Sequence, residues 1–239
     1  PVRCHTMSPH FRRLLLQSAA GLAITLLWVL HAAGAIALPA IDSFERWLYD
    51  KRLVLTAPRG LDQRVVIIDI AQRSLARDGH WPWRRDRVAA LLHILFDEYD
   101  VGLVAFDLPF AEADRRSGLM LLEELSRSWL RDDPQFHTVL ESLRPALDWD
   151  QRLADAMRGR NVLLGYYFSA GTATGAGALP EPIPVLAPRP PAQLPLPRAS
   201  GYMGIYPPVL EAAAGAGFLD NPAVDPDGVP RRLPLLQLY

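Results

Sequence analysis

The chain has 239 residues, of which 50% are hydrophobic and 21% charged, and this composition excludes an intrinsically disordered protein. Its 25 basic and 26 acidic residues give a net charge near −1, so we expect no nucleic-acid binding through a basic surface. The single cysteine, Cys4, excludes an internal disulfide framework and a cysteine-based zinc site.

A long apolar stretch near the N-terminus predicts a transmembrane helix. No Asp, Glu, Lys or Arg occurs between Arg13 and Asp42, and a helix needs roughly 20 residues to cross the hydrocarbon layer. Arginines precede the stretch and acidic residues follow it. The positive-inside rule therefore predicts a cytoplasmic tail at 1–13, a transmembrane helix at 14–40 and an external remainder. The alternative is a cleaved signal peptide, because Ala35–Ala37 is similar to a cleavage site.

The remainder, residues 41–239, reads as one α/β domain that begins with a helix and a strand. Ile41–Arg52 is a predicted helix whose apolar residues follow helical spacing from Phe44 to Leu55, and we expect it to carry the anchor helix away from the bilayer. Arg64–Ile70 (RVVIIDI) is a β-branched run typical of a strand buried on both faces.

A helix and a second strand follow, which completes a predicted βαβ unit. Asp86 is expected to cap a helix whose apolar face runs from Val88 to Tyr99, with Gly102 as its terminator. Leu103–Asp107 is then the second buried strand. Strand, helix and strand with short connections predict parallel pairing and a right-handed crossover.

The next elements predict an insertion followed by a return to the sheet. Two amphipathic helices, Ser117–Leu130 and Pro134–Leu143, form a helical insertion over 117–147. Asp148–Arg158 reads as a helix and Asn161–Phe168 as the next strand. The predicted fold class is therefore α/β, with a mainly parallel sheet and flanking helices, preceded by one N-terminal transmembrane helix.

Residues 170–208 are rich in proline and glycine, and such a segment cannot continue a helix or supply a central strand. We expect either an extended loop packed on the domain or a mobile flap. Gly217–Leu219 and Leu233–Leu238 then read as late strands joined by a turn at Asp225–Gly228. Because the last predicted strand is cut at Tyr239, we expect the domain to be truncated at its C-terminus.

The sequence predicts no catalytic constellation, no metal site and no cofactor. It contains neither a G-x-S-x-G turn nor a G-x-x-x-x-G-K-[ST] loop, and the spacing of His80, His93 and His137 is not that of metal ligands. Asp225-x-Asp227-Gly228 is similar to the start of a calcium loop but lacks the bidentate Glu, which favours a tight turn. We therefore expect the chain not to be an enzyme.

One group of residues predicts a ligand crevice. Ligands of parallel sheets bind beyond the carboxyl ends of the strands, where Asp69 and Asp107 would end two neighbouring strands. Two close carboxylates need a cation, a proton or N–H donors, and Arg85 could serve, as could a metal or a basic ligand. The alternative is that both carboxylates cap loop amides while two tryptophans pack as a lid. The candidate ligand-binding residues are Asp69, Trp81, Trp83, Arg85, Asp107 and Glu112.

Four motifs occur in order behind the apolar stretch. They are Gly79–Arg85 (GHWPWRR), Phe106-Asp107-x-x-Phe110-x-Glu112, Asp150 at the head of a helix, and Asp225–Leu235 with Asp225, Asp227, Gly228, Arg231 and Arg232. Together they resemble the CHASE sensory domain, type two, from about Phe44 to the end of the chain. The sequence departs from the family at Arg84, where the family often has proline, and in the length of the insertion.

The resemblance implies an extracellular sensor associated with bacterial cyclases and histidine kinases. We therefore expect a receptor in the bacterial inner membrane, with the domain outside, an unknown small-molecule or envelope ligand, a homodimer, and a cytoplasmic output module that is most plausibly an adenylate or guanylate cyclase. The alternatives are a histidine kinase or Ser/Thr kinase input domain, a membrane-anchored envelope hydrolase, and a structural module.

Overall fold

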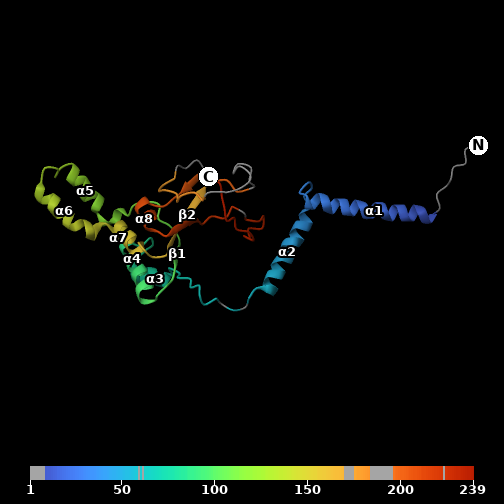
Figure 1. The fold of residues 1–239 in the computed structure, drawn as a ribbon, viewed down its shortest axis with the longest axis horizontal. Helices are drawn as coiled ribbons and strands as arrows, with labels where there is room; N and C mark the ends of the chain where they lie inside the picture. Colours follow the sequence, from blue (N-terminus) through green and yellow to red (C-terminus); the bar gives the residue numbers. More distant parts are fainter. Residues whose placement is uncertain (1–8, 59, 61, 170–174, 184–195, 223) are drawn as a thin grey trace, which may run out of the picture. The chain divides into compact units, whose positions relative to one another are not determined.

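The chain divides into two compact units, Pro1–Asp69 and Ile70–Tyr239, in the computed structural model (Figure 1). The structure describes residues 9–58, 60, 62–169, 175–183, 196–222 and 224–239. The second unit begins at Ile70.

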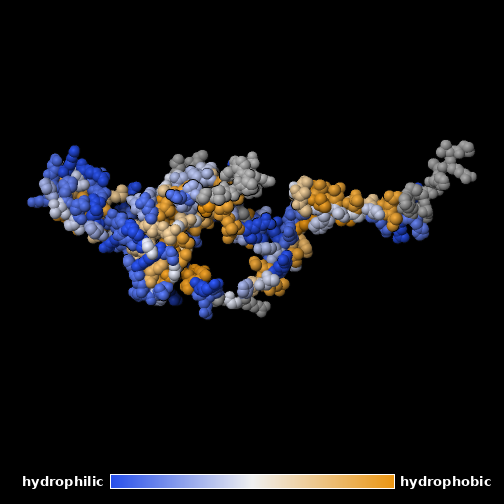
Figure 2. Space-filling view, in the orientation of Figure 1, coloured by the Kyte–Doolittle hydropathy of each residue, from blue (hydrophilic) through white to orange (hydrophobic). Residues whose placement is uncertain are grey.

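The first unit contains the N-terminal apolar helix that the sequence predicts. Helix α1 (Pro9–Ala32) includes a span, Arg12–Ala32, of 21 residues that is long and apolar enough to cross a membrane. Figure 2 shows hydrophobic residues along much of α1. The helix ends at Ala32 rather than at residue 40, because Gly34 adopts a φ of +72° there.

A second helix, α2 (Pro39–Thr56), follows after a short turn and starts on a proline, whose fixed φ suits a first helical position. His31, in the last turn of α1, holds this turn through two contacts. The Nε2 atom of His31 lies 3.3 Å from Oδ1 of Asp42, and its Nδ1 atom lies 3.2 Å from the carbonyl oxygen of Ile36.

The predicted strand over Arg64–Ile70 is wrong. Residues 65–70 form neither helix nor strand, and the side chains of Val65–Ile68 are 56–89% exposed. A strand exists only when a neighbouring strand takes up its N–H and C=O groups, and among the described residues no such partner pairs with this run. The βαβ unit expected from it is therefore also absent from the described residues.

The second unit is an α/β assembly. Its helix α4 runs on into a π-helical segment, η1, and a short 3-10 turn, η2, precedes α5. The elements in chain order are α3 (Gln72–Asp78), α4 (Arg85–His93), η1 (Ile94–Glu98), β1 (Val104–Pro109), η2 (Arg115–Ser117), α5 (Leu119–Arg127), α6 (Pro134–Leu147), α7 (Trp149–Met157), β2 (Val162–Ser169), β3 (Gly201–Met203), α8 (Pro207–Ala212) and β4 (Gly215–Phe218).

The sheet is mainly parallel, as predicted, with β2 at its centre. Strand β1 pairs with β2 in parallel, with Val104 opposite Val162, and β4 pairs in parallel with the other edge of β2. The far end of β2 pairs with β3 in antiparallel fashion, with Tyr167 opposite Met203. The parallel crossovers of this fold therefore run from β1 through α7 to β2, and from β2 through α8 to β4.

One face of the sheet carries the hydrophobic core. Side chains from β2 pack against α4, α7 and α8, and the most deeply buried are Leu92, Leu153, Met157, Val162, Ile205 and Val209. Strand β1 alternates between partly buried and exposed residues, so it is half-exposed rather than buried on both faces as predicted. Ala105 and Asp107 lie on its exposed face.

Several predicted elements are confirmed with small shifts. The insertion forms the hairpin of α5 and α6, which Figure 1 shows projecting from the rest of the second unit. Asp148 caps α7 by accepting a hydrogen bond from the Gln151 N–H at 2.9 Å. Asp86 is not a cap but lies in the first turn of α4, and Asp100 adopts a positive φ just beyond η1.

The C-terminal third differs more from prediction. Much of the proline-rich segment 170–208 lies outside the described residues, but its described part supplies β3, which the sequence did not predict. The predicted strand at Leu233–Leu238 is wrong, because only Leu238 forms an isolated bridge, with Arg198. The turn at Asp225–Gly228 is confirmed by a hydrogen bond from the Gly228 N–H to the Asp225 carbonyl at 2.8 Å.

Candidate functional site

A buried arginine lies just beyond the carboxyl end of β1, where parallel sheets place their functional groups. Arg85 is the first residue of α4, and its side chain is only 9% exposed. Its Nη1 atom lies 2.8 Å from Oδ1 of Asp150, in the first turn of α7. Its guanidinium also lies near the rings of Phe110 and Tyr206, at 5.3 and 5.7 Å from their centres.

The loop after β1 closes around the same guanidinium. The Nη2 atom of Arg85 donates a hydrogen bond to the carbonyl of Glu112. The N–H of Tyr206, which precedes α8, donates to the carbonyl of Phe110 at 2.6 Å. Arg85 therefore holds together α4, the loop after β1 and α7, and this loop is in turn tied to the start of α8.

Asp114 is the second centre of the network, and its side chain is only 2% exposed. Its carboxylate accepts hydrogen bonds from the backbone N–H of Arg85 at 3.1 Å and from the N–H of Arg116 at 3.1 Å. Its own backbone N–H donates to Oδ2 of Asp150 at 2.9 Å. Each of the two carboxylates thus has its own backbone N–H and guanidinium partners, so they do not face each other unscreened.

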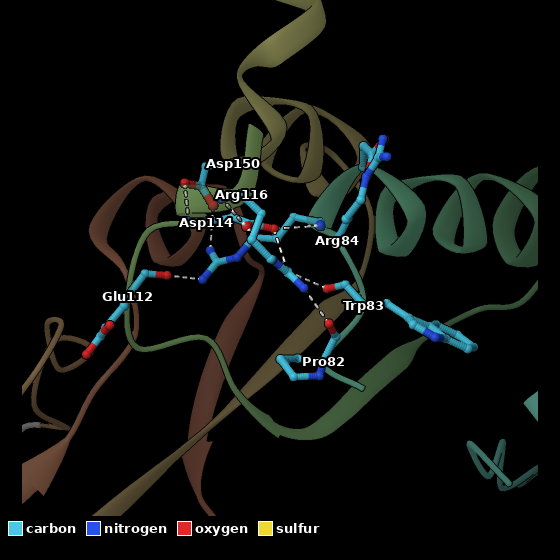
Figure 3. A network of polar contacts seen from close by, with 9 residues as sticks. Pro82, Trp83, Arg84, Glu112, Asp114, Arg116 and Asp150 are labelled. Carbon is cyan, nitrogen blue, oxygen red and sulfur yellow. Dashed lines mark hydrogen bonds and ion pairs between the residues drawn. The ribbon is translucent and has the colours of Figure 1, made fainter. Parts of the chain in front are cut away.

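Arg116 extends the network to the loop before α4. Figure 3 shows its guanidinium reaching the carbonyl groups of Pro82 and Trp83, and the contact to Trp83 measures 2.9 Å. The same guanidinium donates to Asp114, from Nε at 2.8 Å and from Nη2 at 2.7 Å. The carbonyl groups of this loop are thereby tied to the loop after β1.

Burial shifts the pKa of both members of the central ion pair, Arg85 and Asp150. Burial lowers the pKa of Arg85, an effect that Asp150 and Asp114 offset only in part. Burial likewise raises the pKa of Asp150 despite the nearby Arg85 charge. Burial therefore shifts both groups toward their neutral forms, and in a buried ion pair the desolvation cost can exceed the mutual attraction.

The pKa of Asp114 is shifted in the opposite direction to that of Asp150. Burial alone would raise its pKa, but hydrogen bonds from Arg116 and Arg85 together lower it below the ordinary value. A carboxylate that accepts several N–H bonds is stabilised in its charged form. Asp114 is therefore the firmly ionised member of the network.

This arrangement can hold separate segments of the chain in position, because the polar contacts described for it join residues of the network to one another. Charged groups drawn from three separate segments fix the carboxyl end of β1 against the N-termini of α4 and α7. Among the described residues, no group of three or more His, Cys, Asp or Glu side chains could hold a metal ion.

The structure brings four of the six predicted ligand-binding residues to this region. Arg85 is central, whereas Glu112 contributes its backbone carbonyl and keeps its side chain exposed. Trp81 and Trp83 lie in the preceding loop, with ring centres 5.9 Å apart in an edge-to-face arrangement. Trp83 Nε1 donates to the Gly79 carbonyl at 3.0 Å, and the Trp81 side chain is 37% exposed.

The two predicted strand-end carboxylates are not part of the network. Asp107 lies on the exposed face of β1, and its carboxylate makes none of the described contacts around Arg85. Asp69 is the last residue of the first unit and does not end a strand. The premise that Asp69 and Asp107 end adjacent strands is therefore wrong.

The sequence offered Arg85 as a partner for Asp69 and Asp107, whereas the structure pairs it with other carboxylates. The actual partners are Asp114 and Asp150, and sequence reasoning also missed Arg116 and Tyr206. A signal for Asp150 was present, because an acidic residue in the first turn of a helix is held by the helix dipole and is available to a nearby cation. The sequence offered no comparable signal for Tyr206.

The C-terminal motif forms a second, more local arginine cluster. Arg231 Nη1 lies 2.8 Å from Oδ2 of Asp225, and its Nη2 lies 2.9 Å from Oδ2 of Asp227. Gly228 adopts a φ of +80° in the turn, and the carbonyl of Arg232 accepts a hydrogen bond from Asn221 at 2.9 Å. These five predicted motif residues therefore close one turn of the chain.

Comparison with known proteins gives one match. Residues 21–239 match the family described as the CHASE2 domain. No curated protein and no solved structure matches the chain. The match covers the second unit, α2 and the second half of α1.

Proposed function

The chain belongs to the CHASE2 domain family, an extracellular sensor domain of signalling receptors, and we propose on this premise that it is the input domain of a bacterial transmembrane receptor. The observation that carries the proposal is the family match over residues 21–239, which begins within a helix that could span a membrane. We propose that the chain itself is not catalytic and acts by changing the population of two arrangements.

The proposed topology follows from charge and hydropathy. The span Arg12–Ala32 is long enough to cross the bilayer. Arg3, Arg12 and Arg13 lie before or at its start, and the first acidic residue after it is Asp42. This asymmetry supports a cytoplasmic N-terminus and an external second unit, in the inner membrane.

We further propose a nucleotide cyclase as the output module and a homodimer as the working form. Both rest on the resemblance to sensors of cyclases and histidine kinases, with the kinase as the second choice. For the ligand, we propose a small molecule that contacts the exposed rim of the Arg85 network, where the side chains of Trp81 and Glu112 reach solvent. Arg85 would act there as a positioning residue.

Topology is tested with two reporters fused in turn after Tyr239 of the full chain. We expect an active alkaline phosphatase fusion and a dark fluorescent-protein fusion. As a control, the double variant R12E/R13E removes the flanking charge and should reduce phosphatase activity. A bright cytosolic fusion to the unaltered chain would overturn the proposed location.

Ligand binding is tested by a thermal-shift screen of the full chain in lipid nanodiscs, with a library of small metabolites. A ligand selective for the folded state raises the melting temperature. W81A and E112Q should remove that rise without changing the melting temperature of the free protein, and S142A, on the exposed face of α6, is the matched control. A rise that survives both rim variants would contradict the assigned rim.

A further inference from the structure

Helix α2 presents a broad apolar face that the described residues of its own unit leave uncovered. No residue of α2 is buried. At 3.6 residues per turn, most of its apolar side chains occupy an arc of about 140°, whereas Leu53 and Tyr49 lie on the other side of the helix. The exposed members of this arc are Phe44 at 61%, Trp47 at 53%, Leu48 at 42%, Val54 at 75% and Leu55 at 78%.

The other side of α2 is mainly polar and carries most of its charges. Glu45 and Arg46 lie there beside Leu53, and the helix as a whole has three acidic and three basic residues. Lys51 alone interrupts the apolar arc. Its Nζ atom lies 5.9 Å from the centre of the Trp47 ring, and its long stem allows the ammonium to reach water while the stem stays apolar.

Helix α2 begins close to the end of the proposed membrane span. Helix α1 ends at Ala32 and α2 begins at Pro39. The contact of 3.3 Å between His31 and Asp42 ties the first turn of α2 to the last turn of α1. The N-terminus of α2 is therefore held near the level at which the chain leaves the apolar stretch.

We propose that α2 lies in the membrane–water interface on the external side, with its apolar arc among the lipid headgroups and upper acyl chains. This inference rests on the proposed function, in which α1 spans the membrane. A helix with one apolar face, low net hydrophobicity and Trp, Phe and Leu on that face is typical of an interfacial helix. Trp47 and Tyr49 are residue types that gather at that depth.

Two features favour lipid over a second copy of the chain as the covering partner. A two-stranded coiled coil buries a narrow seam of a and d positions, whereas the arc of α2 is about twice as wide. The aromatic pair Phe44 and Trp47, stacked with ring centres 5.7 Å apart, makes that face wide and flat. Equal numbers of acidic and basic residues mean that the attraction does not depend on anionic lipid.

The test uses spin labels on the full chain in phosphatidylcholine nanodiscs. On a C4S background, one cysteine is introduced at a time through F44C, L48C and L55C on the apolar arc, or E45C and R46C on the polar side. L22C in α1 is the membrane reference. Collision rates are measured with oxygen, which concentrates in lipid, and with a water-soluble nickel chelate.

We expect the ratio of oxygen to nickel collisions to be several-fold higher at the three arc positions than at the two polar positions. Nickel access at every α2 position overturns the inference, as does low access to both reagents on the arc. If access to both reagents is low on the arc, spin–spin broadening would show that a second copy of the chain covers it. The absence of broadening would show that another part of the same chain does. If L22C also favours nickel, the membrane anchor itself is refuted, whereas a lipid signal at L22C confines the failure to α2.

A second readout avoids the cysteine variants. Brominated lipids quench tryptophan at the depth of the interface, so the quenched fraction of the unaltered chain should exceed that of W47F. Equal quenching of the two proteins would overturn the interfacial position of Trp47.

Discussion

Two arginine clusters in the second unit differ in how far apart in sequence their members lie. The side chains of Arg85 and Arg231 are equally buried, each 9% exposed. The acidic partners of Arg85, Asp114 and Asp150, come from two later segments, whereas Asp225 and Asp227 lie within one turn of Arg231.

The acidic partners also differ in exposure. The side chains of Asp150 and Asp114 are 12% and 2% exposed, whereas those of Asp225 and Asp227 are 28% and 43% exposed. An unpaired carboxylate in the turn can return to water, but one left in the Arg85 network cannot. The comparison therefore predicts that equal changes at the two arginines have unequal costs.

The largest effect is expected for Arg85→Met. This substitution keeps much of the side-chain volume but leaves Asp150 without its guanidinium, and breaking a buried pair in this way costs about 3–5 kcal/mol. We expect that loss in the free energy of unfolding, measured by guanidinium denaturation of the full chain in detergent. Arg158→Met, at a side chain that is 62% exposed and paired with Asp155, is the matched control and should change it by less than about 0.5 kcal/mol.

If Arg85→Met lowered the free energy of unfolding no more than Arg158→Met does, the network would not contribute to stability. It would also remove the reason for treating Arg85 as a positioning residue in the proposed sensor.

The second prediction concerns the pH dependence of stability, to which the two carboxylates of the network contribute with opposite signs. The pKa of Asp114 is lower in the folded state than its ordinary value, so its stabilisation is complete above about pH 4 and is lost as pH falls through the folded pKa. The pKa of Asp150 is raised, so its contribution has the opposite sign: it favours folding below about pH 4 and is lost as pH rises through the folded pKa.

Asp114→Asn should therefore flatten the acid loss of stability, and Asp150→Asn should steepen it. Asp114→Asn should also cost about 2 kcal/mol at neutral pH, because it weakens hydrogen bonds to buried donors. Unfolding curves at a series of pH values from 3 to 7 measure both effects. Parallel pH profiles for the two variants would contradict the assignment of opposite shifts.

A smaller effect is expected for Arg231→Met. Its two ion pairs are local, and their partly exposed carboxylates regain water when the guanidinium is removed. We expect a loss of about 1–2 kcal/mol that decreases in high salt, measured by the same denaturation method. A loss equal to that of Arg85→Met would erase the distinction between local and distant partners.

The same distinction explains what could be predicted from the sequence. The turn around Gly228 and the helix that begins after Asp148 depend on neighbours within a few residues, and both are confirmed. The strands β1 and β2 are also predicted within two residues, because their apolar runs and flanking turn residues mark them.

Features that depend on distant partners could not be predicted. Val65–Ile68 has the composition of a buried strand, but composition cannot supply a neighbouring strand, and the run is exposed. Strand β3 lies in a proline-rich segment and exists because the end of β2 offers it an antiparallel edge. Asp114 and Asp150 reach Arg85 through the folded chain, so sequence distance hid the pairing.

The smallest effect tests a contact that is entirely local. Asp133 caps α6 by accepting hydrogen bonds from the N–H groups of Gln135 at 2.9 Å and Phe136 at 3.1 Å. Asp133→Ala should cost about 1 kcal/mol. Asp133→Ser, which keeps a capping oxygen, should recover most of that loss.

Hydrogen exchange shows how far each change spreads. Because the hairpin of α5 and α6 projects from the rest of the unit, Asp133→Ala should raise exchange in α6 and leave it unchanged in α4. Arg85→Met should raise exchange in α4 and α7 together. Equal exchange changes in α4 for both variants would mean that the cap is coupled to the buried network after all.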